Sequence, residues 1–229
     1  MPALKLIKKE EISGNIYSFS FQNINSLKWH AGQFLQILIP HQNPDDRGVK
    51  RFFTIASAPF EEIIMITTRI ETENSSSFKK AMINLRAGDI VECNEPQGKF
   101  IVEPEDLTKK IVFIAGGIGI TPIRSILLDI NHKKESFKAD LLYANRDDDL
   151  PFKKDLQNVE NLNENFKIYY FIQPKFIVKE ELDKLYKDYR DINFYLSGPI
   201  NMIKAIANIL YEKDISKDNI RTDYFPGYD

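Results

Sequence analysis

Alternating hydrophobic and polar residues dominate the first hundred positions of the chain. Tyr17, Phe19 and Phe21 alternate with polar neighbours, which is the period of two of a half-buried strand. The same reasoning predicts further strands at residues 33–40, 51–57, 62–70 and 89–95. A helical spacing of apolar residues predicts one short helix over 77–85. Short strands in close succession with a single helix favour a small antiparallel barrel.

From about residue 104 continuous apolar runs alternate with helical patterns. The runs lie at residues 111–115, 140–144, 167–172 and 193–197. Strands that are apolar throughout are buried on both faces, and helices between them indicate a parallel sheet covered on both sides. The sequence therefore predicts two domains, residues 1–103 and 104–229, that meet near the acidic, proline-containing stretch around residue 104.

Composition and charge narrow the function further. The 31 Lys and Arg residues nearly balance the 33 Asp and Glu residues, so no overall charge draws the chain to nucleic acid or anionic lipid. The single cysteine, Cys93, excludes an internal disulfide and an iron–sulfur cluster held by four cysteines of these residues. Scattered histidines predict no metal site. Short apolar runs and an early charged N-terminus predict a cytoplasmic protein without a membrane span or signal peptide. The oligomeric state stays open.

A glycine-rich turn at 115–127 is the sharpest local signal. A buried strand ends, Gly116, Gly117 and Gly119 make a turn, and a helix follows with Thr121 as the expected N-cap and Pro122 at its first position. Glycines let the backbone approach a ligand, and a helix N-terminus favours an anion such as a pyrophosphate. A ligand-free turn is the alternative, because the spacing differs from G-x-G-x-x-G.

Two other segments suggest binding. Ser197, Gly198 and Pro199 again join a strand to a helix, and ligands of parallel sheets lie outside the carboxyl ends of the strands, so Ser197 and Gly119 are expected to face one crevice. In the first half, Arg51 and Phe53 share one face of a strand, an arrangement that suits a phosphate and a stacked ring. An ordinary turn and an ordinary barrel strand are the alternatives.

The order of these motifs along the whole chain resembles the ferredoxin–NADP(+) reductase superfamily, with its R-x-Y-[ST], G-x-x-S, G-G-x-G-x-x-P and [CS]-G-P motifs. The resemblance implies a six-stranded antiparallel β-barrel that binds FAD, joined to a five-stranded parallel α/β domain that binds NADPH or NADH. It also implies that Arg51 holds the FAD pyrophosphate, Phe53 stacks on the flavin and Thr54 lies near flavin N5. Arg69 would reach the flavin nucleotide.

The resemblance extends to the serine loop, where Ser76 matches the loop serine and Ser77 begins the phosphate-facing helix, although Glu73 replaces the usual glycine. In the second domain it implies a nicotinamide nucleotide site made of Gly116, Gly117, Gly119, Thr121, Pro122, Asn145, Arg146, Gly198 and Pro199. The family often has a cysteine beside the nicotinamide C4 and the flavin N5, and the resemblance implies that Ser197 takes this position. Arg146 suits a 2′-phosphate, which favours NADPH slightly, but the aspartates at 147–149 oppose one, so NADPH and NADH both stay open.

The C-terminus resembles the family's acidic and aromatic ending. Asp223 would serve near flavin N5 as the third catalytic residue with Thr54 and Ser197, and Phe225 or Tyr228 would shield the flavin. The expected function is hydride transfer from NAD(P)H to FAD and onward electron transfer to a separate ferredoxin, flavodoxin or other redox protein. A flavin or ferric reductase and a non-catalytic electron-transfer or regulatory subunit are the alternatives.

Overall fold

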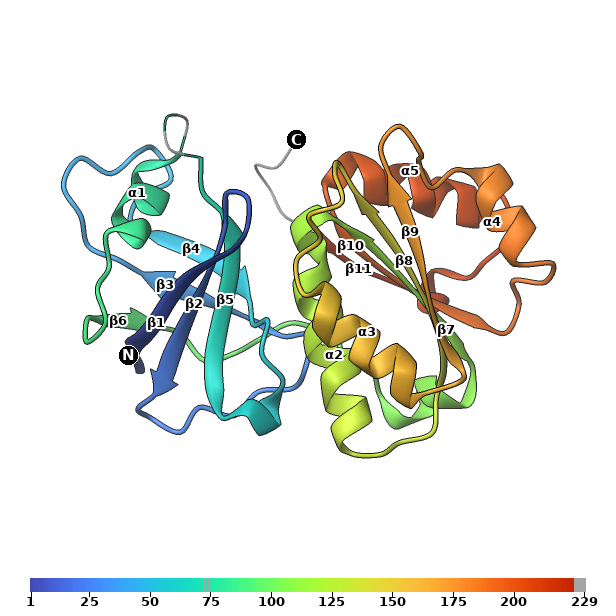
Figure 1. Cartoon of the computed structure of the whole chain (residues 1–229), viewed down its shortest axis with the longest axis horizontal. Coiled ribbons are helices and arrows are strands. Elements are labelled where there is room, and N and C mark those ends of the chain that lie inside the picture. The colour runs from blue at the N-terminus through green and yellow to red at the C-terminus, as the bar shows by residue number, and fades with distance from the viewer. Residues whose placement is uncertain (72, 74, 225–229) are drawn as a thin grey trace. The chain divides into compact units, whose positions relative to one another are not determined.

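The chain divides into two compact units. The structure, a computed structural model, describes residues 1–71, 73 and 75–224 (Figure 1). Met1–Ile101 form the first unit, here called the barrel unit, and Val102–Asp229 form the second, the α/β unit. The boundary expected after residue 103 lies just beyond this division, and the assignment of one cofactor to each unit remains a proposal.

The barrel unit is a six-stranded antiparallel sheet. Its elements are β1 (Ala3–Ser13), β2 (Ile16–Asn23), β3 (Phe34–Leu38), β4 (Lys50–Thr54), η1 (Pro59–Glu61), β5 (Ile63–Arg69), α1 (Ser77–Ile83) and β6 (Ile90–Cys93). The strand order is β4-β3-β6-β1-β2-β5, and an antiparallel bridge between Ile55 and Ile66 joins the chain just after β4 to β5. The two ends of the sheet thereby meet, which confirms the predicted small barrel.

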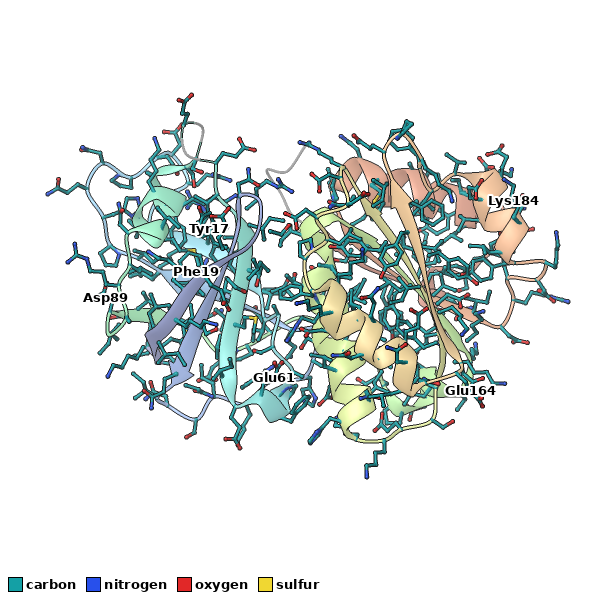
Figure 2. All side chains as sticks on the ribbon, in the orientation of Figure 1. Tyr17, Phe19, Glu61, Asp89, Glu164 and Lys184 are labelled. Atoms are coloured by element: carbon teal, nitrogen blue, oxygen red, sulfur yellow. The ribbon has the colours of Figure 1, made fainter. Side chains whose placement is uncertain are left out.

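Alternating side chains fill this barrel. Phe19 and Phe21 on β2 and Leu35 and Ile37 on β3 are fully buried, and Phe19 points into the barrel (Figure 2). Burying such side chains provides most of the free energy that favours folding. Strand β1 was not predicted from the alternation of residues, because its buried apolar pattern stops after Leu6 and charged residues follow.

The thiol of Cys93 lies in the barrel core and is expected to be unreactive in the native protein. Burial, with a smaller contribution from the negative charge of Glu95, raises the pKa of Cys93 to about 11. At pH 8 the thiolate is then about one molecule in a thousand, whereas in the unfolded chain, with a pKa near 8.5, it is about a quarter. An aromatic disulfide reagent should therefore modify one thiol per chain in guanidinium chloride and almost none without it; rapid native labelling would contradict this placement.

The α/β unit is a five-stranded parallel sheet covered by helices. Its strands are β7 (Lys110–Gly116), β8 (Lys138–Asn145), β9 (Phe166–Ile172), β10 (Ile192–Gly198) and β11 (Ile220–Tyr224). Its helical elements are η2 (Pro104–Thr108), η3 (Gly117–Gly119), α2 (Ile120–His132), α3 (Lys153–Leu162), α4 (Lys179–Leu185), α5 (Ile200–Tyr211) and η4 (Lys217–Asn219). The order β11-β10-β7-β8-β9, with parallel pairing throughout, confirms the predicted sheet.

Helices cover both faces of this sheet. Figure 1 shows α2 and α3 on one face and α4 and α5 on the other. The run Ile111–Ala115 in the central strand β7 is fully buried, as its continuous apolar sequence predicts. Within the residues that the structure describes, no helix has the length and apolar character to cross a bilayer.

A buried carboxylate ties η2 to the sheet. One oxygen of Asp106 accepts hydrogen bonds from Asn193 Nδ2 at 3.1 Å and Arg221 Nη1 at 2.9 Å. The other accepts from the Tyr195 hydroxyl at 2.8 Å and the Glu103 amide at 2.9 Å. Each carboxylate oxygen accepts two hydrogen bonds, so these contacts offset the free energy that burying the charge of Asp106 costs.

Candidate nucleotide-binding sites

The glycine turn after β7 shapes one end of the parallel sheet. Strand β7 ends at Gly116, η3 follows, and α2 begins at Ile120. The expected N-cap at Thr121 is wrong, because the helix begins earlier and the Thr121 hydroxyl donates to the Ile118 carbonyl at 3.1 Å. Pro122 is instead the third residue of α2, still within the first turn, where its missing N–H loses no helical hydrogen bond.

The second turn packs against the first. A Cβ built on Gly119 would lie 2.3 Å from the Ser197 carbonyl oxygen, and one on Gly198 would lie 3.0 Å from the backbone N and O of Gly116. Gly198 also has a φ of 147°, which side-chain-bearing residues rarely adopt. The structure therefore brings together the two motifs that the sequence analysis singled out separately, and glycine is required where they meet.

Ser197 and Asp223 lie side by side at this edge. Ser197 of β10 is in register with Ala115 of β7 on one side and with Asp223 of β11 on the other. Ser197 is fully buried, and its Oγ has no hydrogen-bond partner among the described residues. Most buried hydroxyls are hydrogen-bonded, so the Ser197 hydroxyl is suited to form a hydrogen bond with a bound ligand.

The loop after β8 completes this edge of the sheet. Asn145 Nδ2 donates to the Asp147 carbonyl at 3.1 Å and to its Oδ1 at 3.3 Å, and the Asp149 amide donates to the same Oδ1 at 3.1 Å. A Cβ on Gly117 would lie 3.7 Å from Asn145 Oδ1, which places the loop beside the glycine turn. Arg146 is exposed. The Asp147 side chain is thus held by a hydrogen bond from Asn145, which lies beside the glycine turn.

A second cluster forms around Arg51 in the barrel unit. Its Nη2 lies 2.6 Å from Asp45 Oδ1, and its guanidinium lies 5.3 Å from the ring centroid of Phe78 on α1. Desolvation raises the pKa of Asp45, but hydrogen bonds from Arg51 and from the Arg47 amide outweigh it, so the pKa lies below its usual value. Arg51 Nε and Ser75 Oγ are buried without partners among the described residues, which suits the binding of an anionic ligand.

Phe53, Thr54 and Arg69 are the other residues of the barrel unit that were expected near the flavin. Phe53 is buried with its ring 5.8 Å from that of Phe78, whereas its neighbour Phe52 is the exposed aromatic of β4. Thr54 is buried, and Arg69 donates to Asn15 Oδ1 at 2.6 Å in the β1–β2 turn.

The start of α1 joins the Arg51 cluster. Ser76 caps α1 by accepting from the Lys79 amide at 3.3 Å, and Ser77 accepts from the Asp45 amide at 2.8 Å. Phe225 and Tyr228 lie outside the described residues. Within the described ranges no three His, Cys, Asp or Glu side chains gather as metal ligands.

Comparison with known proteins agrees with this arrangement. The oxidoreductase NAD-binding domain model matches residues 113–208. NADH-cytochrome b5 reductase 1 of Lodderomyces elongisporus is 30% identical over 88% of this chain and 71% of its own length. Flavohemoprotein A of Dictyostelium discoideum is 24% identical over 95% of this chain and 58% of its length. The Na(+)-translocating NADH-quinone reductase of Idiomarina loihiensis matches through one of its chains, 29% identical over 80% of this chain and 50% of that one. The chain thus spans 58% and 50% of the lengths of the last two relatives.

Solved structures share the fold. The FAD/NAD-binding domain of nitric oxide dioxygenase from Vibrio cholerae O1 biovar El Tor matches with a TM-score of 0.83 at 21% identity, over 98% of both chains. Ferredoxin-NADP+ reductase of Plasmodium falciparum matches with 0.81 at 18% identity, over 97% of this chain and 95% of that one.

The antiparallel barrel, the parallel sheet with its two packed glycine turns and the relatives together place the chain in the class of nucleotide-dependent flavoprotein reductases. FAD and NAD(P)H are the cofactors of this class, and Arg51 Nε and Ser197 Oγ, which have no partner within the described part of the chain, fit them. The chain belongs to the ferredoxin–NADP(+) reductase superfamily.

Proposed function

We propose that the chain catalyses hydride transfer from NADH to FAD and delivers the electrons to a separate one-electron acceptor, such as a ferredoxin, a flavodoxin or a haem protein. Bound FAD supplies the conversion of a two-electron donor into one-electron steps. The observation that carries the proposal is the buried Ser197 hydroxyl, which has no hydrogen-bond partner in residues 1–71, 73 and 75–224, beside two glycine turns packed backbone to backbone.

The residues of the chain would bind and orient. Arg51 would hold the FAD pyrophosphate by charge-assisted hydrogen bonds, with Ser76 and Ser77 at the adjoining helix start. The turn at Gly116–Gly119 would admit the nucleotide backbone closely, while Ser197 would hydrogen-bond the nicotinamide end. Asp223 is in register with Ser197 in the sheet, and we propose it as the acidic residue near flavin N5.

NADH is the proposed donor because of the loop after β8. The Asp147 carboxylate is fixed beside the glycine turn by Asn145 and the Asp149 amide, and a fixed negative charge there repels a 2′-phosphate. Arg146, the residue that would favour NADPH, is exposed. Relatives named NADH-cytochrome b5 reductase and NADH-quinone reductase support the same choice.

The acceptor would lie outside these 229 residues. Cys93 is the single cysteine and is buried in the barrel, so these residues cannot supply four thiolates to an iron–sulfur cluster. The names of the relatives print different acceptors, a quinone in one and cytochrome b5 in another, so they support onward electron delivery without selecting an acceptor.

An anaerobic titration of the FAD-loaded protein with NADH and with NADPH tests the proposal. Flavin absorbance should bleach near one equivalent of NADH, with a rate constant per molar nucleotide at least about tenfold above that for NADPH, the effect of about 1.4 kcal/mol of repulsion. Flavin that neither nucleotide bleaches would favour the non-catalytic subunit instead. Rapid turnover of added FMN without any protein acceptor would favour a flavin reductase.

Ser197→Ala tests the role of the serine hydroxyl in the same titration. The Ser197 hydroxyl has no partner among the described residues, so its removal should leave FAD content and the melting temperature unchanged. Bleaching by NADH should slow by about threefold to tenfold, the effect of one hydrogen bond worth roughly 0.5–1.5 kcal/mol. An unchanged rate would make Ser197 a turn residue only.

A further inference from the structure

The guanidinium of Arg51 is held at its two terminal nitrogens and keeps one buried N–H without a partner among the described residues. Its Nη1 donates to the carbonyls of Arg47 and Gly48, each at 2.8 Å, and of Lys50 at 2.7 Å. Its Nη2 donates to Asp45 Oδ1 at 2.6 Å. The Nε–H is buried and has no partner among the described residues. The loop therefore fixes the guanidinium through its two terminal nitrogens and leaves the Nε–H for another acceptor.

Asp45 is itself fixed by contacts other than the one to Arg51. Its Oδ1 also accepts from the Arg47 amide at 3.0 Å, and its carbonyl accepts from the Gly48 amide at 2.7 Å, which makes a hydrogen-bonded turn. Its own amide donates to Ser77 Oγ at 2.8 Å. Because the amide, the carbonyl and the carboxylate are all engaged, the carboxylate is a fixed point to which Arg51 is attached.

The loop is in turn attached to α1 through Ser77. Besides accepting from Asp45, Ser77 Oγ lies 3.0 Å from His41 Nε2, and His41 Nδ1 lies 2.8 Å from the Ile39 carbonyl oxygen. Ser77 is the first residue of α1, and Phe78 follows beneath the Arg51 guanidinium. Residues 39–50 and the first turn of α1 therefore form one hydrogen-bonded assembly around Arg51.

We propose that Asp45 is a positioning residue that orients Arg51 so that its Nε–H meets the pyrophosphate of FAD. The inference rests on the proposed function and adds a residue that does not itself touch the cofactor. A free arginine side chain loses considerable rotamer entropy on binding, and a guanidinium already held at Nη1 and Nη2 loses little. The fixed carboxylate argues against the opposite role, a mobile competitor that occupies the place of the phosphate.

The experiment compares the dissociation constants of FAD and FMN for the apoprotein, measured by flavin fluorescence, since FMN lacks the pyrophosphate. Asp45→Ala should raise the constant for FAD about tenfold, close to the rotamer entropy of an arginine, and leave that for FMN unchanged. Asp45→Asn keeps an acceptor oxygen for Arg51 and should bind FAD at least as tightly as the unchanged protein. Asp46→Ala, a neighbouring exposed aspartate, should change neither constant.

The outcomes separate this inference from the proposed function. Tighter FAD binding by both Asp45→Ala and Asp45→Asn would make Asp45 a competitor and overturn the inference. So would an equal loss of FAD and FMN, which indicates a merely structural role. If Asp45→Ala does not fold, Asp45→Glu keeps the charge but displaces it, and an unchanged FAD-to-FMN ratio in that variant would overturn the inference as well. Unchanged protein that binds neither flavin would instead contradict the proposed function.

Discussion

Replacing Arg51 with alanine is expected to raise the dissociation constant of FAD by about 10- to 100-fold. Hydrogen bonds to charged groups contribute roughly 1.5–3 kcal/mol each, and the substitution removes the proposed one to the pyrophosphate. It also leaves the Asp45 carboxylate and the carbonyl of Gly48 without the guanidinium that they now contact. The barrel unit should therefore lose thermal stability as well as flavin affinity.

The measurement is a fluorescence titration of the apoprotein with FAD, together with a melting curve. Arg47→Ala is the matched control, because Arg47 is exposed, lies in the same loop and contributes backbone atoms to the cluster. It removes the same charge and should change FAD affinity by less than about threefold, as expected for a screened surface charge. Full flavin occupancy in Arg51→Ala would remove the pyrophosphate assignment.

Gly119→Ala is expected to disrupt the nucleotide edge of the α/β unit. Its Cβ would lie 2.3 Å from the carbonyl oxygen of Ser197, 2.5 Å from its carbonyl carbon and 2.7 Å from the Cα of Gly198. These atoms belong to the backbone at the end of β10, which is paired with β7 on one side and β11 on the other, so they cannot move away as a flexible side chain does. We expect a loss of about 3 kcal/mol or more, a fall in melting temperature of about 10 °C, and little nucleotide binding.

Gly117→Ala supplies the comparison for Gly119→Ala. At Gly117 a Cβ meets only Asn145 Oδ1, at 3.7 Å, but φ is +52°. The cost is then backbone strain alone, about 1 kcal/mol. Differential scanning calorimetry should rank the two variants in this order, and FAD binding to the barrel unit should survive in both. Equal stability of Gly119→Ala and the unchanged protein would contradict the close packing of the two turns.

The sequence predicted those parts of the fold in which each residue's role follows from its neighbours in the chain. The run Ile111–Ala115 predicts a strand covered on both faces, and the glycines after it predict a tight turn between this strand and a helix. Strand β1 was not predicted because its alternation of apolar and polar residues gives way to charged residues after Ile7. Strand β11 was not predicted because a short edge strand has too few residues to show a period. Both become strands through pairing, β1 with β2 and β6 and β11 with β10, and pairing cannot be read from one strand's own residues.

The same distinction applies to the candidate sites. The facing of Gly119 and Ser197 follows from a general rule of parallel sheets, because both motifs end strands. Asp45 carried no such signal: its sequence of Asp, Asp, Arg and Gly indicates only a turn. Its contact with Arg51 and Ser77 joins a loop, a strand and a helix, and no local spacing predicts such a meeting.

The hydrogen bonds of Asp106 decide where a nucleotide-binding fragment of this chain can begin. The segment before β7 supplies the carboxylate that accepts hydrogen bonds from Asn193, Tyr195 and Arg221, and this carboxylate also accepts one from the Glu103 amide. A fragment starting at Lys110 would take this carboxylate away from all three side chains and leave Tyr195 and Arg221 only their contact with each other. The residues around 104 are therefore the first element of the second module rather than a spacer, and exchange of that module between proteins must carry them along.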